Sequence, residues 1–150
     1  MYPPQLIPRV VPQRYPFLMI DRIVAHAFKV SATCLKNVTF GEEVLTGHFP
    51  ENPIYPGVLL IEMGLQTTQV MMTDLEAVIS ATASSEKSKA VQGYLLSVEK
   101  FRFAQPVYPG DVLKVTSELE TEAMGMMKAK ITITRDQDEI AKGIVMVGEK

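Results

Sequence analysis

Residues 47–66, GHFPENPIYPGVLLIEMGLQ, pass from a constrained loop into a helix. Three prolines punctuate the first half, which favours a loop of fixed shape. The second half begins at Gly57 and is rich in Leu, Met, Gln and Glu, so it predicts a helix over residues 57–78. Apolar side chains lie on every side of this helix, which indicates that it is buried in the core.

Strand-like segments lie on both sides of the helix. Residues 21–30 and 31–40 precede it and are rich in Ile, Val, Phe and Thr, with the partial alternation of strands. Four more such segments follow, at residues 94–103, 112–121, 126–134 and 140–147. This order lacks the strand–helix alternation of a parallel sheet. It predicts an α+β protein in which an antiparallel sheet of about six strands wraps around one long central helix.

The other segments are predicted to be irregular. Five prolines fall within residues 1–16, so we expect an irregular N-terminal lead-in. Residues 81–90 are small, polar and charged, which favours a flexible excursion. The chain of residues 1–150 has the length of a single domain. Turn signals separate the later strands at residues 105–111, Gly125 and residues 135–139.

Composition argues against several classes of protein. A net charge of −2 gives no electrostatic reason to expect nucleic acid or an anionic membrane as a partner. The single cysteine, Cys34, cannot form an intrachain disulfide or a Cys-rich metal site, and we expect it in the core. No segment approaches the ~20 apolar residues of a membrane helix. The N-terminus does not resemble a signal peptide, so the expected location is cytoplasmic.

Two residues of the central segment are candidates for acid/base chemistry. His48 lies in the constrained loop, and Glu62 lies on the apolar helix, where burial raises the pKa of a carboxyl as a general acid requires. Gln66 shares the helix face of Glu62. The Gly57 N–H is an unpaired donor at the helix start, suited to polarising a carbonyl oxygen. Together they predict a site for proton abstraction beside a carbonyl group.

Each candidate also has a structural interpretation. A loop histidine such as His48 is usually structural or solvated, and Glu62 could be capped by a neighbour or face solvent. Gly57 could serve only to start the helix. The methionines are explained by core packing, although their flexible side chains would also suit an acyl tunnel. His26 is expected to be structural.

The run from Gly47 to Glu62 closely resembles the signature of the 3-hydroxyacyl-[acyl-carrier-protein] dehydratases of fatty acid synthesis, which have the hot-dog fold. The pattern GHFPxxPxxPGVLxxE, with a glutamine at the position of Gln66, is kept at every spacing. Two further blocks match, at residues 14–22 and within residues 101–111.

This resemblance implies a function for each candidate residue. His48 would be the general base and Glu62 the general acid in the conversion of (3R)-3-hydroxyacyl thioesters to trans-2-enoyl thioesters. Gly57 would bind the thioester carbonyl, and Phe49, Val58 and Gln66 would help to bind the substrate. No metal and no cofactor are implied beyond the phosphopantetheine arm that the substrate carries on its acyl carrier protein.

The resemblance also implies an assembly. A sheet with one helix leaves an open edge, and pairing with a second copy would cover it. The implied homodimer, often part of a trimer of dimers, takes His48 from one subunit and Glu62 from the other for each site.

The sequence departs from the family at positions that usually carry cations. Such cations face the acidic carrier protein. Their loss favours a dedicated carrier protein from a secondary pathway of acyl or polyketide synthesis, with Lys100 and Arg102 as remaining contacts. The substituted positions are Ala104, Gln105, Ala123 and Met124.

Two alternatives to the dehydratase stay open. A hot-dog acyl thioesterase usually pairs a carboxylate with a positioned water and needs no histidine in this loop, so His48 argues against it. A non-catalytic acyl-binding subunit would not need the intact pair of His48 and Glu62.

Overall fold

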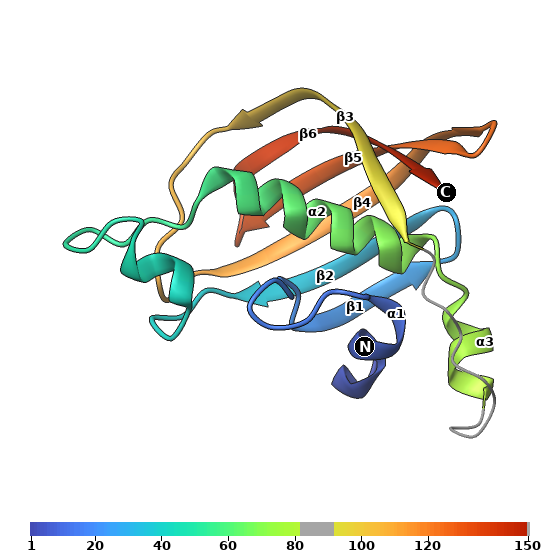
Figure 1. Ribbon diagram of the computed structural model, residues 1–150, viewed down its shortest axis with the longest axis horizontal. Helices are drawn as coiled ribbons and strands as arrows, with labels where there is room; N and C mark the ends of the chain where they lie inside the picture. The colour runs from blue at the N-terminus through green and yellow to red at the C-terminus, as the bar shows by residue number, and fades with distance from the viewer. Residues whose placement is uncertain (82–91, 150) are drawn as a thin grey trace.

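Six antiparallel strands curve around one long helix in the computed structural model, which describes residues 1–81 and 92–149 (Figure 1). The strands follow the order β1-β2-β4-β5-β6-β3 across the sheet. Both the predicted α+β class and the predicted wrapping of the sheet around a central helix are confirmed. The strands are β1 (Arg22–Ala27), β2 (Ser31–Asn37), β3 (Gly93–Phe103), β4 (Val112–Ala123), β5 (Met126–Arg135) and β6 (Asp138–Glu149).

The central helix α2 (Gly57–Met71) packs across β2, β4 and β5 and supplies much of the core. Its buried apolar side chains meet those of the sheet, and one polar contact joins the two layers where Thr68 Oγ1 and Ser117 Oγ share a hydrogen bond of 2.8 Å. Cys34 is buried in β2, as expected. The fully buried large side chains of this core include Met63, Met71, Leu113, Ile131 and Ile133.

Gly64 sets how closely α2 approaches the sheet, so we expect Gly64→Ala to destabilise the protein. A β-carbon at this position would lie 2.7 Å from Cγ2 of Ile131, a buried side chain that is stiff about χ1. Overpacking outweighs the gain in helix propensity, and the free energy of unfolding should fall by about 1–2 kcal/mol in urea denaturation. Gly41→Ala is the control, because its nearest neighbour would be Thr39 Oγ1 at 3.6 Å. Equal stability of the two variants would contradict this view of Gly64.

The prediction of one helix over residues 57–78 was wrong at its C-terminal end. α2 ends at Met71, and a second helix, α3 (Leu75–Ser80), follows it. Asp74 caps α3, because its Oδ1 accepts a hydrogen bond from the Ala77 N–H at 3.1 Å. An aspartate at this position starts a new helix and does not extend the old one.

Three other segments differ from expectation. The lead-in of residues 1–16 is not wholly irregular, since it holds the 3₁₀ turn η1 (Pro4–Leu6) and the short helix α1 (Ile7–Val10). Prolines are tolerated there because the first helical residues need no N–H partner. The loop before α2 likewise contains a 3₁₀ turn, η2 (Glu43–Thr46). The excursion predicted at residues 81–90 lies outside the described residues except for its first position.

The turn signals are confirmed, and the first two strands are shorter than predicted. Lys29 has a φ of 54° and the Val30 N–H donates to Ala27 O, so β1 ends before the predicted residue 30. Met124 and Gly125 both have positive φ, 55° and 74°. Two positive φ values in a row are typical of the tight turn that joins neighbouring antiparallel strands, here β4 and β5.

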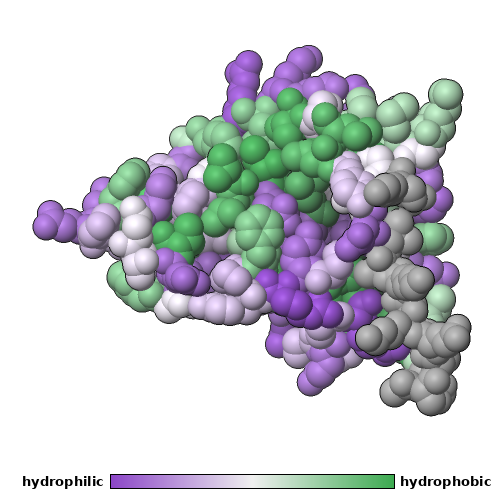
Figure 2. All heavy atoms as spheres, in the orientation of Figure 1, coloured by the Kyte–Doolittle hydropathy of each residue, from purple (hydrophilic) through white to green (hydrophobic). Residues whose placement is uncertain are grey.

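One surface of the isolated chain is unusually apolar. β3 is an edge strand, and Leu95, Leu96 and Val98 on it are exposed. Val58, at the start of α2, is 70% exposed, so the prediction that α2 is buried on every side was wrong for this single chain. Figure 2 shows hydrophobic atoms gathered over α2 and β3. An apolar surface of this kind marks a place for a partner or a ligand.

Candidate active site

The loop before α2 fixes the ring of His48. Its Nδ1 lies 2.6 Å from the carbonyl oxygen of Ile54. A carbonyl oxygen can only accept, so Nδ1 carries a proton, and in the neutral ring Nε2 is then the nitrogen with the free lone pair. Phe49 stacks on the imidazole, with 4.2 Å between ring centroids. The peptide bond between these two residues is cis. With its proton on Nδ1, the neutral His48 ring has the tautomer of a base that acts through Nε2.

A hydrogen bond to the β3–β4 connection and an ion pair to β2 hold this loop in place. The Tyr55 N–H donates to Val107 O at 2.8 Å. Lys36, which is almost fully buried, pairs with Glu42 at 3.2 Å just before η2. Burial raises the pKa of Tyr55, and the nearby carboxylate of Glu42 adds to this effect. The loop that carries His48 is therefore held at both of its ends.

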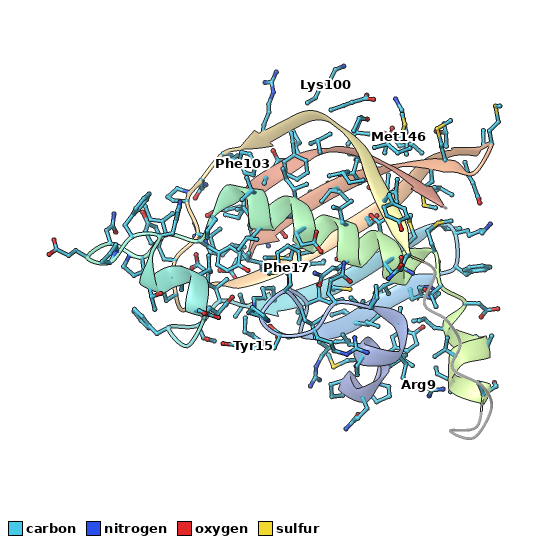
Figure 3. All side chains as sticks on the ribbon, viewed as in Figure 1. Arg9, Tyr15, Phe17, Lys100, Phe103 and Met146 are labelled. Atoms are coloured by element: carbon cyan, nitrogen blue, oxygen red, sulfur yellow. The ribbon has the colours of Figure 1, made fainter. Side chains whose placement is uncertain are left out.

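His48 and Gly57 share a cavity of about 250 Å³. The ring of Phe103 forms part of the wall of this cavity. A β-carbon at Gly57 would lie 3.2 Å from that ring, so the glycine keeps the space between the helix and the ring open. Figure 3 shows Phe103 at the end of β3, next to the start of α2. No described residue accepts a hydrogen bond from the Gly57 N–H, as expected at the first position of a helix.

Glu62 lies on α2 with two amide donors on a single oxygen. Gln13 Nε2 donates to Glu62 Oε1 at 3.1 Å, and Gln66 Nε2 donates to the same oxygen at 2.9 Å. Burial raises the pKa of Glu62, and these two hydrogen bonds offset part of the rise. The raised pKa expected for Glu62 is thus present, and its protonated form persists to higher pH than that of an ordinary carboxyl.

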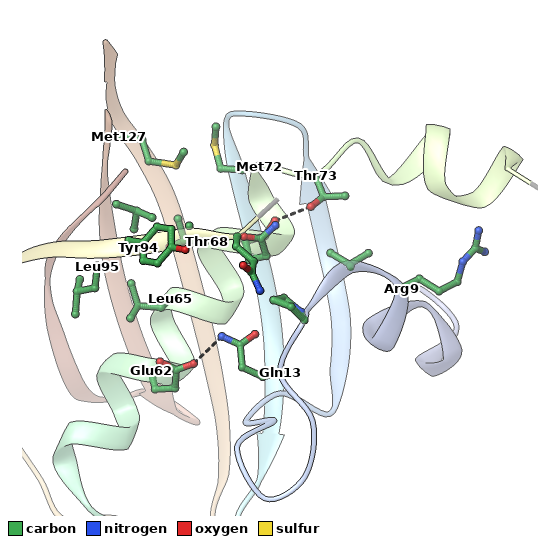
Figure 4. Close-up of a pocket in the computed structure, with 16 residues that line it drawn as sticks. Arg9, Gln13, Glu62, Leu65, Thr68, Met72, Thr73, Tyr94, Leu95 and Met127 are labelled. Atoms are coloured by element: carbon green, nitrogen blue, oxygen red, sulfur yellow. Dashed lines mark hydrogen bonds between the residues drawn. The ribbon is translucent and has the colours of Figure 1, made fainter. Parts of the chain in front are cut away.

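Glu62 opens into a different and larger space from that of His48. It lines a groove of about 550 Å³ that follows α2 past Leu65 and Met72 (Figure 4). His48 is not among the residues of this groove, and Glu62 is not among those of the His48 cavity. Within one chain, then, the structure places His48 with Gly57 in one of these two pockets, and Glu62, beside Gln66, in the other.

The remaining predicted residues lie close to these pockets at the surface. Phe49 is half exposed, and the exposed Val58 lies one residue after Gly57. Sequence reasoning missed Gln13 and Tyr94, which both line the Glu62 groove. Gln13 directly precedes residues 14–22, the block that matches the family, and this was the one sequence feature that could have marked Gln13 as a site residue.

Clusters of metal-binding side chains and membrane-spanning helices are both absent from the part of the chain that the structure describes. Among residues 1–81 and 92–149, no group of three or more His, Cys, Asp or Glu side chains is placed to hold a metal ion. None of the helices in these ranges is long and apolar enough to span a membrane.

Comparison with known proteins identifies relatives over nearly the whole chain. The FabA-like domain matches residues 11–144. The 3-hydroxyacyl-[acyl-carrier-protein] dehydratase FabZ of Polynucleobacter necessarius is 37% identical over 134 residues, which are 89% of this chain and 83% of that protein. The FabZ of Acetivibrio thermocellus is also 37% identical, over 91% of this chain and 87% of its own.

Solved structures share the fold at lower identity. The dehydratase heterocomplex ApeI:P from Xenorhabdus doucetiae aligns with a TM-score of 0.78 and 18% identity, over 100% of this chain and 93% of that one. A hypothetical thioesterase with coenzyme A from Streptococcus pneumoniae aligns with a TM-score of 0.61 and 13% identity, over 86% and 84%. These likenesses establish the hot-dog fold, and the closer sequence relatives establish the family. The chain belongs to the FabA-like family, among the 3-hydroxyacyl-[acyl-carrier-protein] dehydratases.

Proposed function

We propose that this protein removes water from (3R)-3-hydroxyacyl thioesters carried on acyl carrier protein, giving trans-2-enoyl thioesters in fatty acid or related acyl synthesis. The observation that carries this proposal is the state of the two titratable groups. The Ile54 carbonyl holds Nδ1 of His48, which leaves Nε2 of the neutral ring as an acceptor, and burial raises the pKa of Glu62, which favours its protonated form. Elimination of water needs one base and one acid in these states.

The chemistry follows from three groups. The Gly57 N–H donates to the thioester oxygen, which makes the protons on C2 more acidic because negative charge develops on that oxygen. His48 Nε2 removes a C2 proton, and the electron pair forms the C2–C3 double bond. The C3–O bond breaks while Glu62 supplies a proton to the departing hydroxyl. The products are the enoyl thioester and one water molecule, with no change in oxidation state overall.

The complete site in this proposal spans two copies of the chain. Within a single chain His48 and Glu62 line two separate pockets, which supports a site completed by a second copy. The edge strand β3 supports this arrangement, because antiparallel pairing of two β3 strands would satisfy the β3 edge of each chain and cover the apolar Leu95 and Leu96. The same contact would shield Val58. The mass in solution, measured by gel filtration, would show whether three such dimers form a trimer of dimers.

One assay separates this proposal from its alternatives. The pure protein is mixed with a crotonyl or 3-hydroxybutyryl thioester, while enoyl absorbance and free thiol are followed together. Reversible hydration without thiol release is the expected result. Release of thiol would favour an acyl thioesterase, and neither signal would favour a non-catalytic acyl-binding subunit.

The partner in this proposal is an acyl carrier protein, and a dedicated carrier is favoured. Ala104 and Gln105 line the His48 cavity where the family usually has cations. Lys100 and Arg102 are exposed on β3 and are available to an acidic carrier. Titration with housekeeping and dedicated carriers should show tighter binding of the latter, and equal affinity would count against it. The cytoplasmic location stays a prediction.

A further inference from the structure

The two amides on Glu62 differ in how they are held. Gln66 is fixed at both ends of its amide: its Oε1 accepts from the Met19 N–H at 2.8 Å, and its Nε2 donates to Phe17 O at 2.7 Å as well as to Glu62. These backbone partners determine which end is oxygen and which is nitrogen. Gln66 therefore presents a donor to Glu62 whatever the protonation state of the carboxyl.

Gln13 reaches Glu62 from the lead-in and has no such support. Its Nε2 donates to Glu62 Oε1, while its own Oε1 is buried and finds no partner among the described residues (Figure 4). A buried acceptor without a hydrogen bond is unfavourable, and such exceptions call for an explanation. The Gln13 amide thus makes one hydrogen bond and leaves one buried acceptor unpaired, so the bond to Glu62 is the contact that explains why the side chain lies here.

The two contacts also distinguish the carboxyl oxygens of Glu62. Both donors reach Oε1, and no described residue donates to Oε2. Although Oε2 has no hydrogen-bond partner among the described residues, it is not a buried atom, so it is accessible from the groove. In a protonated carboxyl the carbonyl oxygen accepts hydrogen bonds and the hydroxyl donates one. Oε1 thus acts as the carbonyl oxygen, and the proton belongs on Oε2.

We propose that Gln13 is a positioning residue for the acid: with Gln66 it holds Oε1 of Glu62, so that the proton is carried on Oε2 and delivered toward the substrate. This rests on the proposed function, because it assigns an atom to the acid step. The other ionisable groups that line the groove are Arg9 and Tyr94. The Arg9 guanidinium donates to the carbonyls of Val78 and Ala81 and makes no bond to Glu62. In the proposed dimer, His48 of the second copy would also face Glu62.

The test is Gln13→Leu, with Gln5→Leu as its matched control. Gln5 belongs to η1 of the same lead-in, is exposed and lines neither the groove nor the His48 cavity. In Gln13→Leu, kcat for dehydration should fall about tenfold, the scale of one hydrogen bond to a charged group, with KM little changed. The melting temperature should stay close to that of the wild type, because the unpartnered oxygen is removed together with the donor. Gln5→Leu should leave kcat near its original value.

A direct readout of Glu62 separates positioning from a structural role. The carboxyl is titrated by infrared difference spectroscopy, with Glu62→Gln as the blank. Loss of the Gln13 donor removes a group that favours the carboxylate, so the titration, and the matching limb of the pH–rate profile, should move to higher pH. Gln13→Glu has the same shape without the N–H and should shift in the same direction.

Two results would overturn the proposal. One is an unchanged Glu62 titration in both Gln13 variants, and the other is a loss of kcat in Gln5→Leu equal to that in Gln13→Leu. If the wild-type protein dehydrates no thioester, the proposed function fails, but the infrared titration still reports whether Gln13 controls Glu62.

Discussion

Replacing His48 by alanine is expected to lower the rate of dehydration by at least ~100-fold, the usual size of a lost general base. The imidazole is the group with a free lone pair in the Gly57 cavity, since Nδ1 is occupied by Ile54 O. Without it, C2 keeps its proton even when the thioester oxygen is polarised. The measurement is kcat for a 3-hydroxybutyryl thioester, read from enoyl absorbance, with KM determined in parallel.

The control for this variant is the chain's other histidine. His26 lies on β1 and contacts Tyr2 edge-on, with 6.3 Å between ring centroids. His26→Ala should retain most of the activity, because that ring lines neither pocket. Near-normal activity in His48→Ala would remove His48 from the mechanism and leave its contact with Ile54 as a purely structural feature of the loop.

Local signals made the central part of the fold predictable. The prolines of residues 50–56 mark a loop, and the change to helix formers at Gly57 marks the start of α2. Glu62 and Gln66, four residues apart, had to share a helix face, and their side chains are hydrogen-bonded to each other. Hydrophobic periodicity and the residue preferences of turns depend on a few neighbouring residues, so they can be recognised directly in the sequence.

Contacts between distant segments were not predictable in this way. Gln13 and Glu62 are 49 residues apart, and nothing in the spacing of a proline-rich lead-in indicates that it will reach the central helix. The Lys36–Glu42 pair that supports the His48 loop is similar, since its burial depends on how β2 meets η2. The exposed Val58 shows a third limit, because an apolar pattern reports that a residue prefers burial but does not say which chain covers it.

Replacing Glu62 by glutamine is expected to lower dehydration by at least ~100-fold as well, because an amide cannot deliver the proton that the departing hydroxyl requires. The shape of the side chain is kept, and a glutamine oxygen can still accept from Gln13 and Gln66, so the fold should be preserved. The wild-type acid is active only while protonated. Its activity is therefore lost as pH rises through the pKa of Glu62, which burial has raised. Substantial activity in Glu62→Gln would exclude this carboxyl as the proton donor.

Mixing the two inactive variants tests where their groups meet. If His48 and Glu62 of different subunits form each site, a mixed dimer of His48→Ala and Glu62→Gln has one site with both residues intact and one with neither. Random pairing of equal amounts should then restore about a quarter of the wild-type activity after the chains are refolded together. Each variant refolded alone should stay inactive, which gives the baseline.

The double variant mixed with wild-type chains gives the complementary result. Every site of such a mixed dimer lacks one group, so about a quarter of the activity of an all-wild-type sample should remain, whereas sites built within one chain would keep about half. Sites within one chain would also show no recovery when the single variants are mixed. We expect the first outcome, because His48 and Glu62 of one chain line two separate pockets.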